Sequence, residues 1–395
     1  NMIRSIFQDQ GGILWVGTYS GALNKYDQKK AVFTNYTQNL SKVNSLSDKN
    51  VWAIFEDNRG YIWIGTNNGL NRLNRTTDQI VHYFNKRNDP KSLSHNLVRT
   101  IFQDSRGDLW IGTEGGGLNR YNYQKNNFDR FIHDPSDPSS ISDNSLRYIY
   151  EDSKRNLWIA TLNGLNKFDP ARKFFGKYYH NPLNPNSLSG NHVRYIYEDK
   201  RGTIWIATFN GMSLYIKKEN RFISFRNSPS NPASLANNRV LCFHEDHAGR
   251  FWIGTYGGGL ELLDRNEFIF IHYSKEVGLP NDAIYGILED EEGNLWLSTN
   301  QGLIKFNPEN RKIKIFESSD GIQGNEFNGN AFFKNNKGEM FFGGINGITI
   351  FSPQEVKENN FIPKVVLTSF KKYNLEVNLP HAIYKTDQID LSYKD

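Results

Sequence analysis

The sequence predicts an all-β fold, a β-propeller of four-stranded blades, and three observations support this prediction. An aromatic anchor recurs every 44–48 residues along nearly the whole chain of 395 residues. An Asp stands six residues before seven of the eight anchors, and a Gly stands six residues after all eight. The segments between them alternate apolar and polar residues as strands do, and a repeat of this length built from strands is typical of propeller blades. The anchors are Trp15, Trp63, Trp110, Trp158, Trp205, Trp252, Trp296 and, in the eighth place, Phe341.

Each unit contains four predicted strands, which the third unit illustrates. Residues 98–102 alternate in a pattern rich in β-branched and aromatic residues, which predicts the first strand. Residues 104–107 offer an Asp that can cap its own turn and a Gly that can take a positive φ, so they predict a tight hairpin. Residues 109–113, 118–121 and 128–132 are the second, third and fourth strands. Four antiparallel strands per unit make one blade.

Polar links join the blades, several of them rich in proline, and each carries one apolar residue. This residue recurs 17 residues before the anchor, so we interpret it as a plug that docks the link onto the next blade. The plug residues are Leu46, Leu93, Ile141, Leu188, Leu235 and Leu279.

The number of strands predicts how the ring closes. Eight units carry the first three strands, but only seven carry a fourth, because none follows the last unit. Propellers commonly close by adding a strand from one end of the chain to the blade at the other end, which removes an exposed edge. Residues 32–36 can supply this strand. We therefore expect a seven-bladed propeller over residues 32–353, preceded by residues 1–31 as the last blade of another propeller; an eight-bladed ring is the alternative.

The repeat pattern stops after Pro353. Residues 354–361 are polar and predict a linker. Residues 362–395 begin with an apolar, strand-like segment, which predicts the start of a separate β domain that the chain does not finish.

Composition excludes several classes of function. Lys and Arg number 47 against 42 Asp and Glu, a net charge of +5 with no block of like charge, which argues against a dedicated nucleic-acid binder. Cys242 is the only cysteine, so there is no disulfide framework and no Cys-based zinc site. No apolar run approaches the roughly 18–20 residues that a membrane helix needs.

The residues that could carry chemistry follow the repeat and do not gather in one place. A Glu-Asp pair recurs once per blade at the same turn, so we interpret these pairs as turn caps rather than as the two neighbouring carboxylates that glycoside hydrolysis needs. His192, His244 and His247 fall in different strands and turns, and no histidine spacing is typical of a metal site. The glycine runs at 115–117 and 257–259 precede no helix that could bind phosphate. We therefore expect no catalytic residues, no metal and no cofactor.

One position of the repeat predicts a ligand site. It lies five residues before the repeated Asp, near the start of each innermost strand, and hence at one mouth of the central channel. Arginine forks beside aromatic faces suit a sugar that carries a carboxylate or sulfate. The alternative is that each Arg pairs with an acid of the neighbouring blade. The candidate ligand-binding residues are Trp52, Arg99, Arg147, Arg194 and Tyr285 at this position, with Phe209 and Tyr256 four residues after their anchors.

The unit at residues 98–119, with Asp104, Gly107 and the run LWIGT at 109–113, resembles the two-component regulator propeller repeat. Residues 338–347 are similar to the closing blade of such arrays. Residues 362–368 and 389–395 are similar to the start of the immunoglobulin-like triple-tyrosine (YYY) domain found after them. The departures from the repeat are Arg155, which replaces the turn Gly, and Asn335 with Phe341 in the last unit.

The resemblance implies a function as well as a fold. It implies the extracytoplasmic sensor region of a membrane-bound regulator, often a histidine kinase or hybrid two-component system, on the periplasmic or extracellular side of a bacterial inner membrane. Membrane attachment would come from segments outside this sequence, and the full-length protein would be a homodimer. In gut-bacterial members the ligands are oligosaccharides from glycan breakdown.

We therefore expect a non-enzymatic segment that binds a soluble ligand, an oligosaccharide, and passes a conformational change to an output that follows it. Two alternatives remain open from sequence. A protein-interaction scaffold fits the same fold, and would show a large exposed apolar patch. A propeller lyase or hydrolase would need a cluster of His, carboxylates or a metal at the channel mouth.

Overall fold

The computed structural model describes residues 2–9, 12–19, 23–27, 33–42, 44–169, 174–275 and 278–356, together with 369, 371–372 and 375–376. The chain divides into two units. Residues 31–356 form one unit, and residues 1–30 with 357–395 are grouped in the other. Each unit is described by itself.

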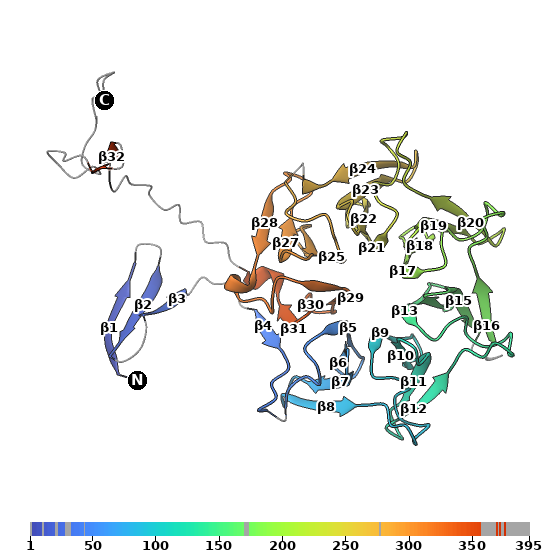
Figure 1. The fold of residues 1–395 in the computed structure, drawn as a ribbon, viewed down its shortest axis with the longest axis horizontal. Coiled ribbons are helices and arrows are strands. Elements are labelled where there is room, and N and C mark those ends of the chain that lie inside the picture. The colour runs from blue at the N-terminus through green and yellow to red at the C-terminus, as the bar shows by residue number, and fades with distance from the viewer. Residues whose placement is uncertain are drawn as a thin grey trace. The chain divides into compact units, whose positions relative to one another are not determined.

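The larger unit is a ring of seven four-stranded antiparallel sheets (Figure 1). Blade 1 consists of β5 (Val51–Glu56), β6 (Tyr61–Thr66), β7 (Gly69–Asn74) and β8 (Gln79–Tyr83). Blade 2 consists of β9 (Val98–Gln103), β10 (Leu109–Thr113), β11 (Leu118–Asn122) and β12 (Asn127–Phe131). Blade 3 consists of β13 (Leu146–Glu151), β14 (Leu157–Thr161), β15 (Gly164–Asp169) and β16 (Phe174–Tyr178). Blade 4 consists of β17 (Val193–Glu198), β18 (Ile204–Thr208), β19 (Gly211–Ile216) and β20 (Arg221–Phe225).

The remaining three blades complete the circle. Blade 5 consists of β21 (Val240–Glu245), β22 (Phe251–Thr255), β23 (Leu260–Asp264) and β24 (Ile269–Tyr273). Blade 6 consists of β25 (Gly286–Glu289), β26 (Leu295–Ser298), β27 (Leu303–Phe306) and β28 (Ile313–Phe316). Blade 7 consists of β29 (Phe327–Lys334), β30 (Met340–Gly344), β31 (Gly347–Phe351) and, from the other end of the unit, β4 (Thr34–Tyr36).

The strand β4 closes the ring. It pairs antiparallel with β31, with Tyr36 opposite Ile348 and Thr34 opposite Ile350. Because β31 would otherwise have an unpaired edge, this exchange supplies the fourth strand that blade 7 lacks. The predicted seven-bladed propeller is confirmed, and the eight-bladed alternative is wrong.

The aromatic anchors and the plugs of the links form the core between blades. The anchors of all seven blades are at most 1 % exposed, and the six predicted plugs are at most 3 % exposed. Trp63 of blade 1 packs edge-on against Tyr121 of blade 2, with ring centroids 4.9 Å apart. The core therefore lies at the interfaces between neighbouring sheets, as the repeat requires.

The repeated Asp ties its hairpin to the anchor. In blade 2, Oδ1 of Asp104 accepts hydrogen bonds from the backbone N–H groups of Arg106 and Asp108, and Oδ2 accepts one from the indole Nε1 of Trp110 at 3.1 Å. Blade 3 keeps this turn without glycine, because Arg155 takes a φ of 63°. The interpretation of the Glu-Asp pairs as turn caps fits the Asp, whereas the Glu accepts from the turn of a neighbouring blade and does not cap its own.

The Glu before that Asp joins neighbouring blades. The turn N–H of Ser105 in blade 2 donates to Oε2 of Glu151 in blade 3 at 2.8 Å. The same bond recurs from blade to blade, with Gln103 in place of Glu in blade 2. Where blade 7 carries Lys334 instead, its ammonium donates to the Glu289 carbonyl oxygen of blade 6 at 2.7 Å. The other turn N–H donors are Asn58 to Gln103, Ser153 to Glu198, Lys200 to Glu245 and His247 to Glu289, whereas the side-chain amide of Asn335 in blade 7 donates to Glu56 in blade 1.

The smaller unit repeats part of the blade pattern. Strands β1 (Ile3–Gln8), β2 (Ile13–Thr18) and β3 (Leu23–Asp27) form a three-stranded antiparallel sheet. Here too the anchor Trp15 donates from Nε1 to Asp9, at 2.9 Å. That this unit is the last blade of a preceding propeller stays a prediction.

The segment after the propeller is described only in part. Pro353–Glu355 form a 3-10 turn, and Val356 is buried against blade 7, so packing continues just past the predicted boundary at 353. The strands β32 (Lys371–Lys372) and β33 (Leu375–Glu376) form a short antiparallel pair. The rest of the predicted YYY segment, and residues 357–361 of the predicted linker, lie outside the described residues.

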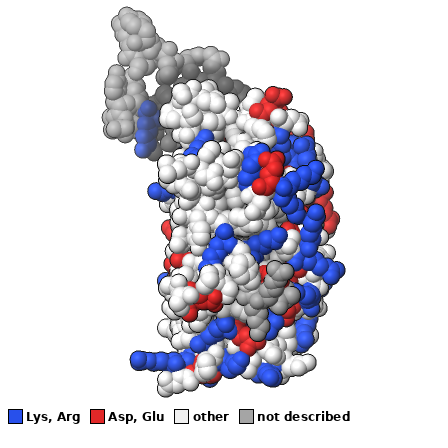
Figure 2. Space-filling model, turned by 90° about the vertical axis from the view of Figure 1, so that its right-hand side faces the viewer, with Lys and Arg blue, Asp and Glu red and all other residues white. Residues whose placement is uncertain are grey.

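The surface carries both signs of charge. On the side drawn in Figure 2, Lys and Arg side chains lie among Asp and Glu side chains and are densest toward one edge. Within the part of the chain that the structure describes, no helix is long and apolar enough to cross a bilayer.

Candidate functional site

The starts of the innermost strands meet around a small cavity at one mouth of the channel. Its volume is about 210 Å³. Four of its lining residues are the predicted Trp52, Arg99, Arg147 and Arg194, which we call the mouth cluster, and they come from β5, β9, β13 and β17 of four successive blades (Figure 1). The cavity is also lined by Gly329 and Asn330 of β29, which were not among the predicted site residues.

Two of the three arginines share one carboxylate. The guanidinium of Arg99 lies 3.9 Å from the ring centroid of Trp52 and also binds Glu114, to which its Nε donates at 2.5 Å. Nη2 of Arg147 donates to the other oxygen of Glu114 at 3.1 Å. Although burial opposes the charge on Glu114, the hydrogen bonds and positive charges of Arg147 and Arg99 hold the pKa of this carboxyl below its ordinary value.

The third arginine has no acidic partner of its own. The guanidinium of Arg194 lies 5.0 Å from the ring centroid of Phe209 and makes no ion pair with any described residue. Its Nε is buried, as is the Nε of Arg147, and neither atom has a hydrogen-bond partner among the described residues. Burial and the repulsion from Arg147 and Arg99 lower the pKa of Arg194 to about 10, so it remains charged at neutral pH.

A neutral histidine stands beside this arginine. The rings of His192 and Phe209 lie 4.2 Å apart between centroids. Burial, followed by the positive charges of Arg194 and Arg147, lowers the pKa of His192 to about 4. At neutral pH His192 is therefore uncharged and adds no charge beside Arg194.

A bulge in β29 forms the floor of the cavity. The register of β29 against β30 shifts between Phe327 and Phe332, and Asn330 within the bulge has a φ of 67°. Nδ2 of Asn330 donates across the channel to the carbonyl oxygen of Arg147 at 2.8 Å. A Cβ on Gly329 would lie 3.2 Å from Nη2 of Arg194, so only glycine leaves the arginine its present position without adjustment. Asn330 therefore bridges the channel at this level, beneath the mouth cluster.

The other predicted residues lie around the cavity and do not line it. Phe209 lies under Arg194. A ring carbon of Tyr285 lies 3.7 Å from where a Cβ of Gly329 would be, so Tyr285 borders the floor. Tyr256 is 42 % exposed, and its ring centroid lies 6.2 Å from that of Tyr285. Tyr256 thus belongs to the rim.

The alternative of pairing with the neighbouring blade holds for one arginine. Arg147 of blade 3 pairs with Glu114, which lies between β10 and β11 of blade 2. Arg99 pairs with the same Glu114 inside its own blade, and Arg194 has no acidic partner among the described residues. Three guanidinium groups therefore face one carboxylate, and the mouth keeps an excess of positive charge.

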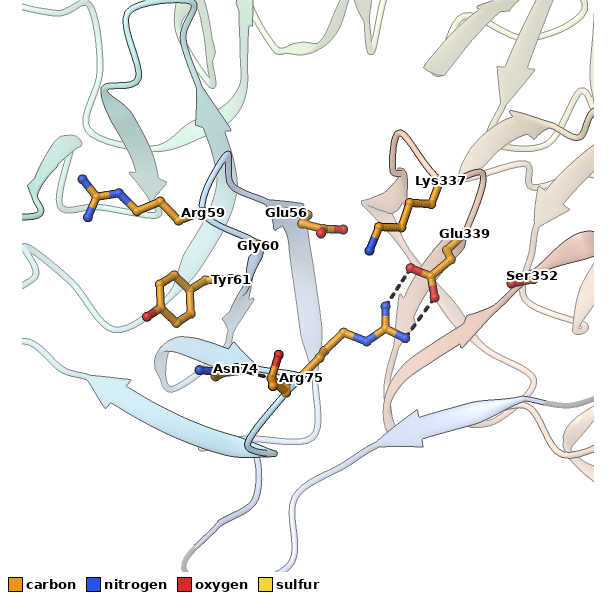
Figure 3. Close-up of a pocket in the computed structure, with 10 residues that line it drawn as sticks. Glu56, Arg59, Gly60, Tyr61, Asn74, Arg75, Lys337, Glu339 and Ser352 are labelled. Carbon is orange, nitrogen blue, oxygen red and sulfur yellow. Dashed lines mark hydrogen bonds and ion pairs between the residues drawn. The ribbon is translucent and has the colours of Figure 1, made fainter.

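A groove between blades 1 and 7 is bridged by an ion pair. It has a volume of about 710 Å³. Figure 3 shows Arg75 and Glu339 facing each other across it, with bidentate hydrogen bonds of 2.7 and 2.9 Å. The hydrogen bond from Arg75 lowers the pKa of Glu339. Because this pair links the first blade to the last, we interpret the groove as part of ring closure.

No group of three or more His, Cys, Asp and Glu side chains that could hold a metal occurs in the described parts of the chain. The two histidines His244 and His247 converge on Glu289, with His247 Nδ1 and Glu289 Oε1 2.6 Å apart. Against the effect of burial, their hydrogen bonds lower the pKa of Glu289 to about 2. The site that stands out is therefore the cationic mouth.

Comparison with known proteins identifies the repeat. The family model "Two component regulator propeller" matches residues 1–20, 45–68, 92–115, 140–163, 187–210, 234–257 and 278–301. Six of these matches fall in blades 1–6 and one in the smaller unit, whereas blade 7, which carries Asn335 and Phe341, is not matched.

Solved structures and a curated relative agree with this match. The extracellular domain of a protein described as a hybrid two-component system of B. thetaiotaomicron is 27 % identical, with a TM-score of 0.77 over 96 % of this chain and 50 % of that chain. A second such extracellular domain from this organism shares the fold at 23 % identity, with a TM-score of 0.66 over 94 % of this chain and 49 % of that one. Histidine kinase P4 of Formosa agariphila is 31 % identical over 125 residues, which are 30 % of this chain and 9 % of the kinase.

The chain thus spans about half the length of the two solved domains and a small part of the kinase. The resemblance of the repeats expected from sequence is confirmed: the chain carries two-component regulator propeller repeats, whereas the resemblance of its last residues to a YYY domain stays a prediction.

Proposed function

We propose that this propeller is the non-enzymatic ligand-sensing part of a membrane-bound two-component signalling protein, and that it binds a soluble oligosaccharide at the mouth cluster. The observation that carries the proposal is the convergence of Trp52, Arg99, Arg147 and Arg194 on one cavity. Closure of the ring does not require this repeat position to hold different residues in different blades. Variation at a single mouth of a regular ring is how repeat proteins build recognition surfaces.

The relatives support the signalling role. Two solved neighbours are described as extracellular domains of hybrid two-component systems, and the curated relative is named a histidine kinase. This likeness supports the proposal that the propeller lies on the periplasmic or extracellular side of a bacterial inner membrane. It would act in a homodimer whose membrane attachment and output lie in other segments.

A ligand at the mouth would signal through differential binding. It shifts an equilibrium between two arrangements only by the difference in its affinity for them. The floor of the cavity belongs to β29 of blade 7, and the chain leaves the propeller directly after β31 of the same blade. Contacts with the floor therefore reach the blade that joins the propeller to the following segment.

Tryptophan fluorescence tests ligand binding at this mouth. Seven of the eight tryptophans are repeat anchors, and Trp52 is the exception. Titration with a panel of neutral and acidic oligosaccharides is expected to change the emission, and Trp52→Phe is expected to remove most of the change while calorimetry still detects binding. If no oligosaccharide alters the emission, releases heat or raises Tm, while a protein partner binds tightly, the ligand proposal is wrong and the scaffold alternative stands.

A further inference from the structure

The charges of the mouth are not balanced by the protein. Arg99, Arg147 and Arg194 lie around one cavity of about 210 Å³, and Glu114 is the carboxylate bound to two of them. Surface arginines keep their charge in water at little cost, but burial of a charge without a partner is unfavourable. Such an excess of buried positive charge is retained at a cost in stability, which an anion would relieve.

The unpartnered atoms show that Arg147 and Arg194 keep hydrogen-bond donors that the described part of the protein does not use. The Nε atoms of Arg147 and Arg194 are buried and have no hydrogen-bond partner among the described residues. An Arg side chain donates to a carboxylate or sulfate in a planar fork that uses Nε or the terminal nitrogens. Arg99 is less suited, because its guanidinium is already held by Glu114 and stacked on Trp52.

The shape of the pocket limits what enters. Its volume is below the range of roughly 300–1,000 Å³ typical of pockets for whole drug-sized ligands. The bulge at Gly329 and Asn330 lies beneath it, where Asn330 bonds to the opposite side of the ring. The cavity therefore has room for one end of a long ligand and not for the whole of it.

We propose that the mouth binds the acidic end of its ligand, with a carboxylate or sulfate on a terminal sugar residue seated between Arg194 and Arg147 and the rest of the chain lying along the rim. This inference rests on the proposed function for the sugar part of the ligand, whereas the anion site itself does not. Neutral oligosaccharides would bind more weakly, because the guanidinium groups would remain without a counter-charge.

The test uses simple anions first. Sodium glucuronate and sodium sulfate, titrated against sodium chloride at equal ionic strength, are expected to raise the Tm of the protein by several degrees, since a ligand that binds only the folded state stabilises it. Arg194→Gln and Gly329→Ala are expected to weaken this binding at least tenfold. The control is Arg201→Gln, which removes the same charge from an exposed turn of the same blade.

Oligosaccharides of equal length then separate the two proposals. We expect trigalacturonate or 6-sulfated galactotriose to bind at least tenfold more tightly than galactotriose, and the better of the two acids identifies carboxylate or sulfate as the preferred group. Absence of any stabilisation by glucuronate and sulfate, or an equal loss in Arg194→Gln and Arg201→Gln, overturns the anion site. Equal affinity for galactotriose and its acidic forms overturns it as well, while leaving oligosaccharide sensing intact. Conversely, anion binding through Arg194 without binding of any oligosaccharide supports the site and contradicts the proposed sensing function.

Discussion

Arg194 holds a positive charge in surroundings that oppose it. Burial and the neighbouring Arg147 and Arg99 lower its pKa to about 10, and Nε lacks a partner among the described residues. A residue retained against stability in this way is typical of binding sites, where function and stability compete. The cost belongs to the free protein and would disappear when a ligand supplies the missing charge.

A stability measurement on the free protein checks this conclusion. We expect the free energy of unfolding of Arg194→Gln to equal that of the wild type or to exceed it by about 1 kcal/mol, because replacing a charge that has no acidic partner in the described structure removes a desolvation cost. Arg147→Gln should instead be neutral or destabilising, since it breaks an ion pair with Glu114. Chemical denaturation of both variants decides the matter, and a loss of more than about 1 kcal/mol in Arg194→Gln would show that the residue is structural.

His192 predicts how acid acts on the same site. Its pKa is lowered from 6.5 to about 4 by burial and by Arg194 and Arg147. The unfolded state therefore binds a proton between pH 6.5 and 4 that the folded state rejects, so the stability associated with neutral His192 is complete above pH 6.5 and is lost as the pH falls toward 4. This part of the pH dependence of the free energy of unfolding amounts to about 1–2 kcal/mol after allowance for solvent screening, and it should be absent in His192→Gln.

Urea denaturation of the wild type and His192→Gln at pH 7, 5.5 and 4.5 measures the difference. Glu114 is the only carboxylate bound to the mouth cluster in the described structure, and its own pKa is lowered, so it contributes mainly below this window. If the free energy of unfolding falls by the same amount in both proteins between pH 7 and 4.5, the prediction is wrong.

The residues of the site were predictable to the extent that they follow the repeat. Trp52, Arg99, Arg147 and Arg194 share one register position, so their meeting at one mouth follows from the ring alone. Glu114 lies in a loop between strands, where side-chain direction depends on the fold, and its role was not predicted. Asn330 occupies the same register position, but the bulge that carries it into the channel depends on contacts with the opposite blades.

At the scale of the element, the hairpin and its anchor act as one unit. The Asp carboxylate divides its oxygens between turn N–H groups and the indole N–H. Blade 7 changes both partners together, with Asn335 and Phe341. Phenylalanine has no N–H to donate, so the second acceptor is not needed. The amide of Asn335 instead donates to Glu56 and Glu339, at 2.7 and 2.8 Å.

This pairing predicts a coupled pair of substitutions in blade 2. Asp104→Asn should cost about 1–3 kcal/mol, because one buried N–H group loses its acceptor and meets another donor. In a protein that already carries Trp110→Phe, the same Asp104→Asn change should cost at least about 1 kcal/mol less, since the indole donor is gone. A double-mutant cycle from denaturation curves gives the coupling energy.

Simple additivity of the two changes would contradict this account. The matched control is Asp108→Asn with Trp110→Phe. The Asp108 side chain faces Arg120 at 3.9 Å and does not bind the indole, so this pair should show little coupling.

Elements were predictable where local pattern determines them. The third unit was expected to have strands at 98–102, 109–113, 118–121 and 128–132, and β9 to β12 follow within one residue. The exception is β29, whose register shift no alternation of residues signals. A bulge is selected by what lies opposite it, and in this ring that is the backbone of Arg147 in blade 3.

At the scale of the whole molecule, one position of the repeat makes a hydrogen bond at every interface of the ring, with a different donor or acceptor at the two interfaces of blade 7. The side chain at the end of each innermost strand forms a hydrogen bond with the blade before it. This side chain is Glu in five blades, Gln103 in blade 2 and Lys334 in blade 7. Stability in such arrays is shared between neighbours, so the seam inside blade 7, where β4 pairs with β31 from the other end of the unit, is where the loss of a segment should matter most. Strand counting predicted its position, because seven fourth strands had to serve eight units.

Closure by β4 therefore gives the last prediction. A chain that begins at Gln38 lacks β4, which leaves the edge of β31 unpaired. It also loses Phe33, whose ring lies 5.1 Å from Phe351 and 5.7 Å from Phe316, and the hydrogen bond from Asn35 to the Gly321 carbonyl oxygen at 2.6 Å. Removal of a packed aromatic side chain alone costs about 3–5 kcal/mol, so this chain should unfold at a markedly lower temperature and associate through the exposed edge.

The matched control is a chain that begins at Ala31, which retains β4 and removes only the preceding residues. It should keep the Tm of the propeller and remain monomeric, because the larger unit has its own core. Thermal denaturation followed by circular dichroism, with light scattering for the association state, compares the two chains. Equal Tm values would mean that blade 7 holds without its fourth strand, and that the ring is kept closed by the Arg75–Glu339 pair and the bond from Asn335 to Glu56 across the same interface.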